Sequence, residues 1–261
     1  MKIAVTGKGG VGKTTFSALL CRLYEQEGVG VLAVDADPDS NLASTLGFPA
    51  DQHPIPVSEL KELIHERTGV QPGSWGGVFK LNPKVDDIPD QYCLRRGSLS
   101  LIVMGKVEKG GKGCVCPESA FLKALMTHMV FQQGQHLIMD MEAGLEHLGR
   151  GTAQGVDALV VIVRPDSKSI ETARRIVPLW RDLGDRKLFF VGNEARDAGD
   201  VDFIKAALSD YPLLGVLPES ETIRSAARDG VTPFDDEFIM NEVRRIRVRL
   251  EAETGAAGTG L

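Results

Sequence analysis

The chain has 261 residues and a formal net charge of -6, with 43% hydrophobic and 25% charged residues. These values are typical of a globular protein with a packed core, and the acidic balance disfavours a protein that coats nucleic acid non-specifically. No apolar run is long enough to cross a membrane, and the N-terminal MKIAVTG is too short for a signal peptide. We therefore expect a cytoplasmic protein that binds neither nucleic acid nor membrane and keeps its four cysteines reduced.

Short apolar runs predict strands along most of the chain. Several runs are apolar over their whole length, which is typical of parallel strands that are covered on both faces. In chain order, the predicted strands are Lys2–Thr6, Val31–Asp35, Leu99–Met104, His136–Met141, Ala158–Val163, Leu188–Gly192 and Leu213–Leu217.

Helical patterns separate these strands. They cover, in chain order, Thr14–Glu27, Ser58–Arg67, Pro117–Phe131, Ile170–Leu183, Val201–Ser209, Glu221–Asp229 and Asp235–Ala252. The alternation predicts an α/β fold, with one domain over residues 1–252 and a mostly parallel central sheet of about seven to eight strands flanked by helices. Residues 68–98, rich in glycine and proline, are expected to be irregular, and residues 253–261 to form a flexible tail.

A phosphate-binding loop is predicted directly behind the first strand. The sequence GKGGVGKT, from Gly7 to Thr14, matches the pattern G-x-x-x-x-G-K-[ST] between a strand and a helix. Lys13 is expected to contact the β- and γ-phosphates of a nucleotide, and the Thr14 hydroxyl to reach Mg²⁺. The alternative, a glycine-rich turn without a ligand, is disfavoured by this spacing and context. The predicted nucleotide-binding residues of the loop are Gly9, Gly10, Val11, Gly12, Lys13, Thr14 and Thr15.

Two predicted strands end in acidic residues that we expect beside this loop. The first is followed by DADPDSNLA, which places Asp37 just beyond the strand. The second, in HLIMDMEAG, ends near Asp140, which is expected to lie with Asp37 in the Mg²⁺ shell. Gly144 gives the next loop the freedom to approach a γ-phosphate. Either ordering of the nucleotide loop or capping of the next helix explains two further polar residues, Asp39 and Asn41.

Polar residues at the ends of two later strands are candidates for base recognition. In FFVGNEA, Asn193 carries an amide that can both donate to and accept from an adenine edge. In GVLPES, Pro218 and Glu219 follow the last predicted strand. Turn formation is the alternative at both places.

A cysteine pair stands before the helix that begins near Pro117. Cys114 and Cys116 are one residue apart, where the helix dipole and nearby lysines, Lys109 and Lys112, favour the thiolate form that binds borderline metals. Two thiolates are half of a tetrahedral site, and two copies related by a two-fold axis supply four. The alternative is a pair of small buried apolar side chains.

The second lysine of the phosphate loop, Lys8, gives it the pattern K-G-G-x-G-K-T. This pattern resembles the deviant Walker A motif of the MinD, ParA and nitrogenase iron-protein class of P-loop ATPases. The resemblance implies that Lys8 acts in trans on the phosphates of a dimer partner. It also implies that Asp37 orients the attacking water, and that the sites at Asn193 and at Pro218 and Glu219 recognise adenine. The frequent Asn-Lys pair of that class is Asn-Glu in this chain.

Three further segments, DADPDSNLA, CVCPE and DMEAGLEHLGRGT, narrow the resemblance. Together they closely resemble the CooC-type ATPases, accessory proteins for nickel insertion into carbon monoxide dehydrogenase. The resemblance implies a homodimer that binds ATP or ADP with Mg²⁺ and has carbon monoxide dehydrogenase as its client. It implies that Lys8, Lys13 and Asp37 are catalytic, and that Ni²⁺, or Zn²⁺ in its place, is held by Cys114 and Cys116 of both chains.

Other functions stay open on the sequence alone. A nickel-delivery ATPase for acetyl-CoA synthase shares this chemistry, and an iron–sulfur carrier ATPase also bridges a dimer with cysteines, although its pair usually has two intervening residues. A membrane-cycling regulator of the MinD type needs an amphipathic helix such as Asp235–Ala252, for which packing on the domain is favoured. A DNA-partitioning ATPase does not need the cysteine pair.

Overall fold

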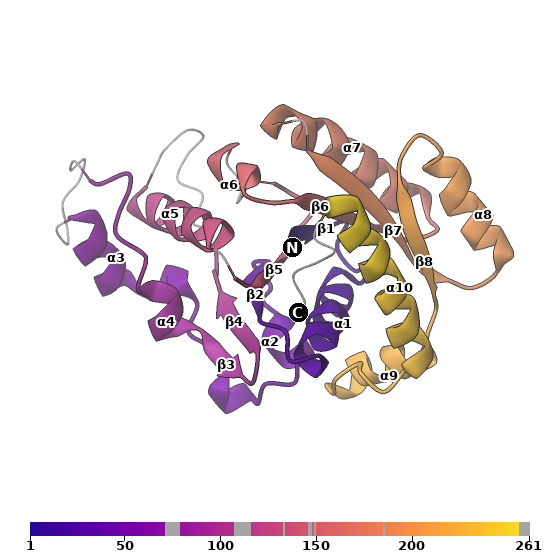
Figure 1. Cartoon of the computed structure of the whole chain (residues 1–261), viewed down its shortest axis with the longest axis horizontal. Coiled ribbons are helices and arrows are strands. Elements are labelled where there is room, and N and C mark those ends of the chain that lie inside the picture. Colours follow the sequence, from indigo (N-terminus) through magenta and orange to yellow (C-terminus); the bar gives the residue numbers. More distant parts are fainter. Residues whose placement is uncertain are drawn as a thin grey trace.

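An eight-stranded sheet forms the centre of the computed structural model, which describes residues 1–70, 79–106, 116–132, 134–145, 148, 150–184 and 186–255 (Figure 1). The strand order is β3-β4-β2-β5-β1-β6-β7-β8, and β3 alone runs antiparallel to its neighbour. The strands are β1 (Lys2–Thr6), β2 (Val31–Ala36), β3 (Leu94–Arg96), β4 (Leu99–Val103), β5 (His136–Met141), β6 (Ala158–Val163), β7 (Lys187–Ala195) and β8 (Leu213–Pro218).

The four central strands are almost wholly buried, as their largely apolar sequences predict. β1 lies between β5 and β6, while β2 lies on the far side of β5. The chain therefore leaves β1 in one direction across the sheet and β6 in the other. In open α/β sheets, a ligand binds where the connections diverge in this way, beyond the carboxyl ends of the strands. The predicted phosphate loop follows β1 at that place.

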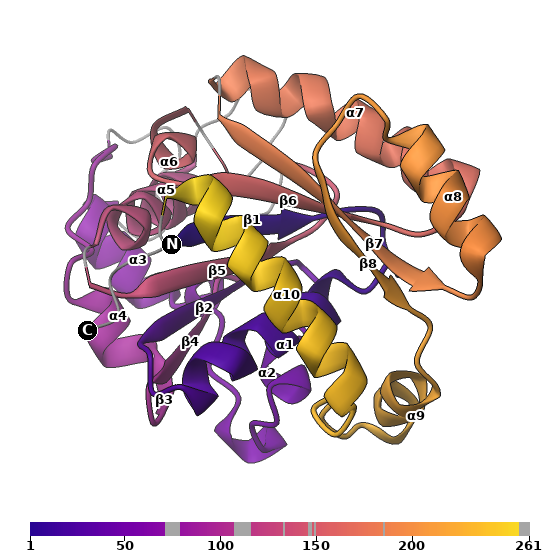
Figure 2. The ribbon, with the colours of Figure 1, turned by 45° about the vertical axis from the view of Figure 1, so that its right-hand side comes forward.

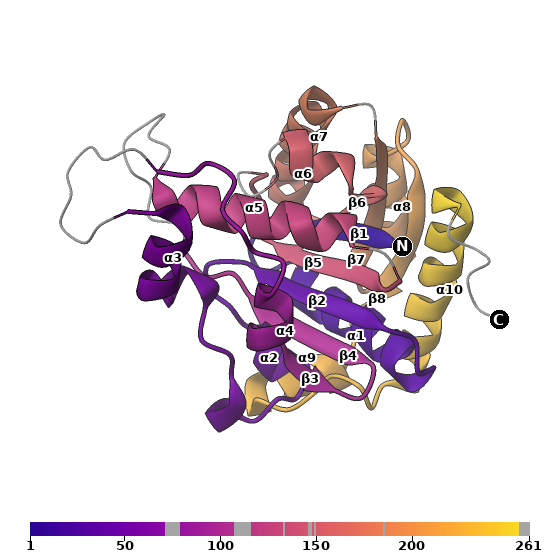
Figure 3. The same cartoon turned by 60° about the vertical axis from the view of Figure 1, so that its left-hand side comes forward.

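Helices cover both faces of the sheet, each over its own apolar core (Figures 2 and 3). One face carries α1 (Lys13–Gln26), α2 (Leu42–Thr45) and α10 (Glu237–Thr254). The other carries α3 (Lys61–Thr68), α4 (Ile88–Tyr92), α5 (Pro117–Phe131), α6 (Arg150–Gln154), α7 (Ser167–Leu183) and α8 (Ala198–Ala207). After β8, α9 (Glu221–Asp229) lies beside the start of α10 in Figure 2.

Helix α10 packs on the domain through the apolar face that the sequence predicts. Ile239, Val243, Ile246 and Leu250 are at most 3% exposed, and the helix contacts β8 and α1. Arg247 donates to Glu27 on α1 at 2.8 Å. This apolar face is therefore covered by protein. In the part of the chain that the structure describes, no helix is both long and apolar enough to span a bilayer.

Several element boundaries differ from the prediction. The stretch 68–98, expected to be irregular, contains α4 and β3, and β3 pairs with β4 through a tight turn in which Gly97 has φ of 56°. The helix expected over Ser58–Arg67 is divided into a 3-10 turn, Val57–Glu59, and α3, because Leu60 between them has ψ of 59°. The short helices α2 and α6 were not predicted, since four or five residues carry too little periodicity.

Two boundaries bear on the candidate site and the predicted tail. β7 continues through Asn193 to Ala195, beyond the predicted end at Gly192, because the strand carries a bulge near its end. α10 continues to Thr254, into the predicted tail, and Gly255 ends it with φ of 75°. Residues 256–261 lie outside the described residues.

Candidate functional site

The loop between β1 and α1 requires glycine at two positions. Gly7 has φ of +149°, and a β-carbon there would lie 2.4 Å from the carbonyl oxygen of Ile162. Gly12 has φ of +91°, and a β-carbon there would lie 2.2 Å from Nδ2 of Asn193. Side chains are excluded at both positions by strands β6 and β7. The glycine pattern of the sequence is therefore explained by close backbone packing of the loop against its neighbours.

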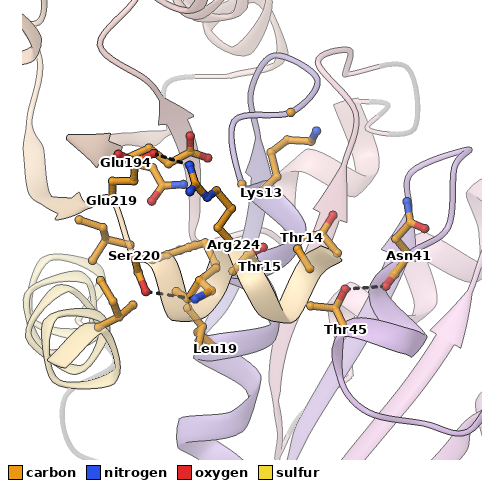
Figure 4. Close-up of a pocket in the computed structure, with 18 of the residues that line it drawn as sticks. Lys13, Thr14, Thr15, Leu19, Asn41, Thr45, Glu194, Glu219, Ser220 and Arg224 are labelled. Atoms are coloured by element: carbon orange, nitrogen blue, oxygen red, sulfur yellow. Dashed lines mark hydrogen bonds and ion pairs between the residues drawn. The ribbon is translucent and has the colours of Figure 1, made fainter. Parts of the chain in front are cut away.

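A cavity of about 450 Å³ opens beside this loop (Figure 4). Ten of the predicted nucleotide-site residues line it: Gly9, Gly10, Gly12, Lys13, Thr14, Thr15, Asp37, Asn193, Pro218 and Glu219. Asp39 and Asn41 line it as well. The cavity thus joins residues that follow β1, β2, β7 and β8, as expected for a site at the carboxyl ends of parallel strands.

Asp140 lies behind the cavity wall, where it is fully buried. Its carboxylate accepts a hydrogen bond from Thr14 Oγ1 at 2.6 Å and one from Ser17 Oγ at 3.3 Å. Burial raises the pKa of Asp140 to about 6, although the Thr14 bond and the charge of Lys13 act in the opposite direction. A hydroxyl and a carboxylate so close together are hard oxygen ligands, so this pair fits Mg²⁺.

The loop after β2 is folded around one buried carboxylate, that of Asp35. Its two oxygens accept from the backbone N–H groups of Asp37, at 3.2 Å, and Leu42, at 3.0 Å. Burial raises the pKa of Asp35 to about 7. This arrangement directs Asp37 into the cavity, where its carboxylate lies 3.7 Å from Lys13 Nζ.

Asn41 precedes α2 but makes no capping hydrogen bond through its side chain. Its side chain instead lines the cavity. Of the two interpretations that the sequence leaves open for Asn41, the structure favours the one at the nucleotide loop.

The far end of the cavity combines one amide with apolar walls. Asn193 Nδ2 donates to the carbonyl oxygen of Val11 at 2.8 Å, so the amide is anchored to the phosphate loop. Apolar residues line this end together with the polar residues Glu219, Ser220 and Arg224; the apolar ones are Leu19, Leu217, Pro218, Ile223, Ala227 and Ile239. A planar apolar ligand fits these walls.

Lys8, Val11 and Gly144 are described by the structure, but they are not among the residues that line the cavity. Lys8 Nζ lies 3.8 Å from Asp166 Oδ1, and both side chains are partly exposed. Asp166 also caps α7 by accepting from the N–H of Ser169. Lys8 is therefore held at the outer side of its own loop, and Gly144 stands in the loop after β5.

A second contact beside the loop, which the sequence did not predict, involves Glu194, a residue that lines the cavity. Arg164 lies 3.1 Å from Glu194 and donates to the carbonyl oxygen of Gly10 at 3.4 Å. Glu194 adopts φ of 57°, the left-handed conformation. Arg164 and Asp166 directly follow β6, so their position at the carboxyl end of a predicted strand was the signal that could have identified them.

Cys116 is the N-cap of α5. Its sulfur accepts from the N–H of Ser119 at 3.4 Å, and its thiol donates to Ser119 Oγ at 3.3 Å. Pro117 occupies the first turn, as predicted. Cys114, Lys109 and Lys112 lie outside the described residues. Of the thiols elsewhere, burial raises the pKa of Cys21 far above its ordinary range and that of Cys93 to about 11.

Cys116 lines a second cavity, of about 730 Å³, together with the loop after β2. Its walls include Pro38, Asp39 and Ser40 from that loop and Glu118 from α5. Asp39 lines both cavities, so one short loop separates the phosphate loop from the thiol. Within the described ranges, no group of three or more His, Cys, Asp or Glu side chains could hold a metal ion.

Comparison with known proteins gives the family. Residues 2–234 match the model of the CobQ/CobB/MinD/ParA nucleotide binding domain. This chain belongs to that family. The carbon monoxide dehydrogenase accessory protein CooC of Rhodospirillum rubrum is 44% identical over 237 residues, which cover 90% of each chain. An uncharacterized ATP-binding protein of Methanocaldococcus jannaschii is 40% identical over 253 residues, or 97% of this chain and 93% of the relative.

The same fold occurs in MinD of Pyrococcus horikoshii, solved as a complex with Mg-ADP. The TM-score is 0.67 at 18% identity, with full coverage of both chains. The predicted α/β fold with a mostly parallel sheet is therefore confirmed, and so is the resemblance to CooC-type ATPases.

Proposed function

We propose that this chain is an ATPase that delivers nickel to carbon monoxide dehydrogenase and works as a cytoplasmic homodimer, with residues 1–252 as its ATPase domain. The observation that carries the proposal is the 44% identity to a carbon monoxide dehydrogenase accessory protein over 90% of both chains. The phosphate-loop cavity and the N-cap position of Cys116 support it independently.

ATP hydrolysis in this proposal uses residues that line or adjoin the first cavity. The amides of the glycine loop and Lys13 bind the phosphates, and Thr14 and Asp140 hold Mg²⁺. Bound Mg²⁺ would neutralise charge that develops on the phosphate oxygens. Asp37, directed into the cavity by Asp35, orients the attacking water. Asn193, Pro218 and Glu219 contact the base, and Gly144 brings the loop after β5 toward the γ-phosphate.

Lys8 contacts the phosphates that are bound to a second copy of the chain. In its own subunit it points to Asp166, on the outer side of the loop. An exposed ion pair at 3.8 Å contributes little to stability, so the pair can open when a partner's phosphates present more negative charge. Hydrolysis then depends on dimerisation, as it does when an arginine finger is supplied by another protein.

Nickel is the cargo, and Zn²⁺ can replace it. Cys116 is the N-cap of α5, and its sulfur accepts a hydrogen bond from the Ser119 N–H. Cys116 and Cys114 of two chains together offer four sulfur ligands, which is a complete tetrahedral set.

The second cavity suggests how nucleotide and metal are coupled. Asp39 and Ser40 belong to the loop that contains Asp37, and they share this cavity with Cys116. A nucleotide that moves this loop therefore changes the surroundings of the thiol. By thermodynamic linkage, nickel must change nucleotide affinity by the same factor.

Anaerobic calorimetry with Ni²⁺ and Zn²⁺, combined with light scattering, tests the proposal. We expect one metal per two chains, formation of a dimer, and loss of both when Cys114 and Cys116 are replaced by Ala. Cys93→Ala is the matched control, since Cys93 is half-buried and is not among the residues that line the cavity of Cys116. Metal binding that is indifferent to the double substitution would overturn the nickel function. Equal nickel affinity with and without nucleotide would overturn the coupling alone.

A further inference from the structure

The base end of the nucleotide cavity contains a cation that the sequence analysis did not identify. Arg224 lines the cavity together with Ile223 and Ala227, all on α9 (Figure 4). Lys13, the lysine of the phosphate loop, is 7% exposed, whereas the side chain of Arg224 is 67% exposed. The two cations therefore differ in exposure. Lys13 is buried at the predicted phosphate site, and Arg224 lies at the solvent-exposed opening of the cavity.

The backbone that carries Arg224 is firmly anchored. Ser220 caps α9 by accepting from the N–H of Ile223 at 3.1 Å, and its hydroxyl donates to Asp236 at 2.5 Å. Asp236 in turn caps α10 by accepting from the N–H of Ile239 at 3.0 Å. The first turns of two helices are thus joined by one pair of side chains. Arg224 extends into the cavity from a rigid base.

The guanidinium forms ion pairs at the protein surface. Arg224 lies 2.5 Å from Glu221, which is 65% exposed, and 3.8 Å from Glu219, which is about one-third exposed. Glu219 is also 3.2 Å from Arg196, which lies outside the cavity lining, so it keeps a partner if Arg224 turns away. Figure 4 shows Arg224 reaching from α9 toward Glu219 across the cavity mouth. Exposed pairs of this kind contribute little, so the side chain can turn toward a ligand.

The walls beneath Arg224 match one face of a nucleobase. Leu19, Leu217 and Ile239 are apolar and mostly buried, and they offer nothing that hydrogen-bonds to a ring edge. A planar guanidinium over the opposite face of the ring adds both stacking and cation–π attraction, which a lysine supplies less well. A base held on apolar walls from one side would therefore be covered by Arg224 from the other.

We propose that Arg224 closes the mouth of the base compartment by stacking its guanidinium on the bound purine, and so slows nucleotide release. This inference rests on the proposed function, since it requires that the cavity binds ATP and ADP. It assigns to α9 a direct contact with the nucleotide that is separate from the phosphate contacts of the glycine loop.

Binding of two probes, ADP and inorganic pyrophosphate, to the full chain tests this assignment. We expect Arg224→Ala to weaken ADP binding about five-fold, mainly through faster dissociation, because a partly exposed cation–π contact has this size. Pyrophosphate has no base, so its affinity stays unchanged. Arg224→Lys should recover part of the ADP affinity. Arg228→Ala is the matched control, since Arg228 lies one turn later on α9, is 71% exposed, and is not among the cavity-lining residues.

The outcomes are distinguishable. Equal weakening of ADP and pyrophosphate would make Arg224 a phosphate ligand and overturn the stacking assignment. Unchanged ADP affinity in Arg224→Ala, with its melting temperature preserved, would overturn it as well. A wild-type chain that bound neither probe would overturn the proposed ATPase function together with this inference. Arg224→Lys keeps the test decisive if the alanine variant does not fold.

Discussion

Two helices of this protein begin at candidate functional residues, and the contacts that the structure describes at the two helix starts differ in origin. The phosphate loop before α1 is packed against three other strands: Gly7 against β6, Asn193 of β7 against Val11, and Asp140 of β5 against Thr14. Cys116 before α5 is held by Ser119 of its own helix. Both positions favour negative charge through the helix dipole. The difference teaches that contacts from residues distant in sequence set the geometry of the phosphate loop, whereas a local contact orients the sulfur of Cys116.

The largest effect is expected from a substitution in the phosphate site. Lys13→Ala removes a nearly buried cation from the phosphate site, so ATP affinity and turnover should both fall by at least about a hundred-fold. Calorimetry and a phosphate-release assay measure the two quantities. Lys8→Ala is the informative counterpart, because it should abolish turnover and leave ATP binding by each subunit intact. Wild-type turnover in Lys8→Ala would refute its role in trans.

The cysteine site is tested at Ser119, the residue whose contact with the Cys116 sulfur the structure describes. Ser119→Ala removes the hydroxyl that contacts Cys116 but leaves the backbone N–H, and we expect nickel affinity to fall by about ten-fold. The nickel–thiolate charge-transfer band should shift as well, which a purely structural defect in α5 would not cause. Lys123→Ala, at an exposed position of the same helix, serves as the control. An unaltered affinity and spectrum would show that the thiol needs no such support.

The free energy of unfolding should depend on pH because of Asp35, which lies at the start of the loop between the two sites. Burial raises the pKa of Asp35 to about 7, so the folded chain retains a proton that the unfolded chain has lost. The stability from this proton is complete below the ordinary aspartate pKa and is lost as pH rises through about 7. The nucleotide-free protein should therefore melt at a lower temperature near pH 8 than near pH 5.5, by roughly a few degrees.

Asp35→Asn separates the contribution of Asp35 to this pH dependence from that of the other titrating groups. Asparagine cannot titrate, so the fall in melting temperature over this pH range should become shallower. Part of the fall should remain, because the pKa of Asp140 is also raised, to about 6. The comparison concerns the slope and not the absolute stability, because the amide also loses one of the two acceptors used by Asp37 and Leu42. Identical slopes in both proteins would contradict a raised pKa at Asp35.

The smallest effect is expected at the ion pair between Arg164 and Glu194, where the nucleotide cavity opens to solvent. Glu194→Gln removes the ion pair with Arg164, in which both partners are about one-third exposed. Such pairs contribute little, so ATP affinity should change by less than about two-fold. A competition titration measures it. A much larger loss of ATP affinity would mean that the conformation of the phosphate loop depends on this partly exposed contact as well as on the buried ones.

Local sequence patterns were sufficient to predict a site whose residues all lie in one short segment. The order of strand, glycine loop and helix places Lys13 and Thr14 without knowledge of any other part of the chain. The antiparallel strand β3 shows the limit, because three residues cannot display a period. Its turn at Gly97 and Ser98 was the one available hint. The bulge that carries Asn193 inside β7 was hidden for the same reason.

The sequence by itself determined the family, the alternating order of elements, and which residues stand at strand ends, because these follow from patterns of a few neighbouring residues. Only the tertiary structure decided which strand ends meet. It paired Lys8 with Asp166, turned Arg224 into the nucleotide cavity, and brought Asp39 to the cavity of Cys116. Asp39 and Cys116 are 77 positions apart, and Lys8 and Asp166 are 158 positions apart. Such distances are closed by the packing of helices on the sheet, which no local pattern records.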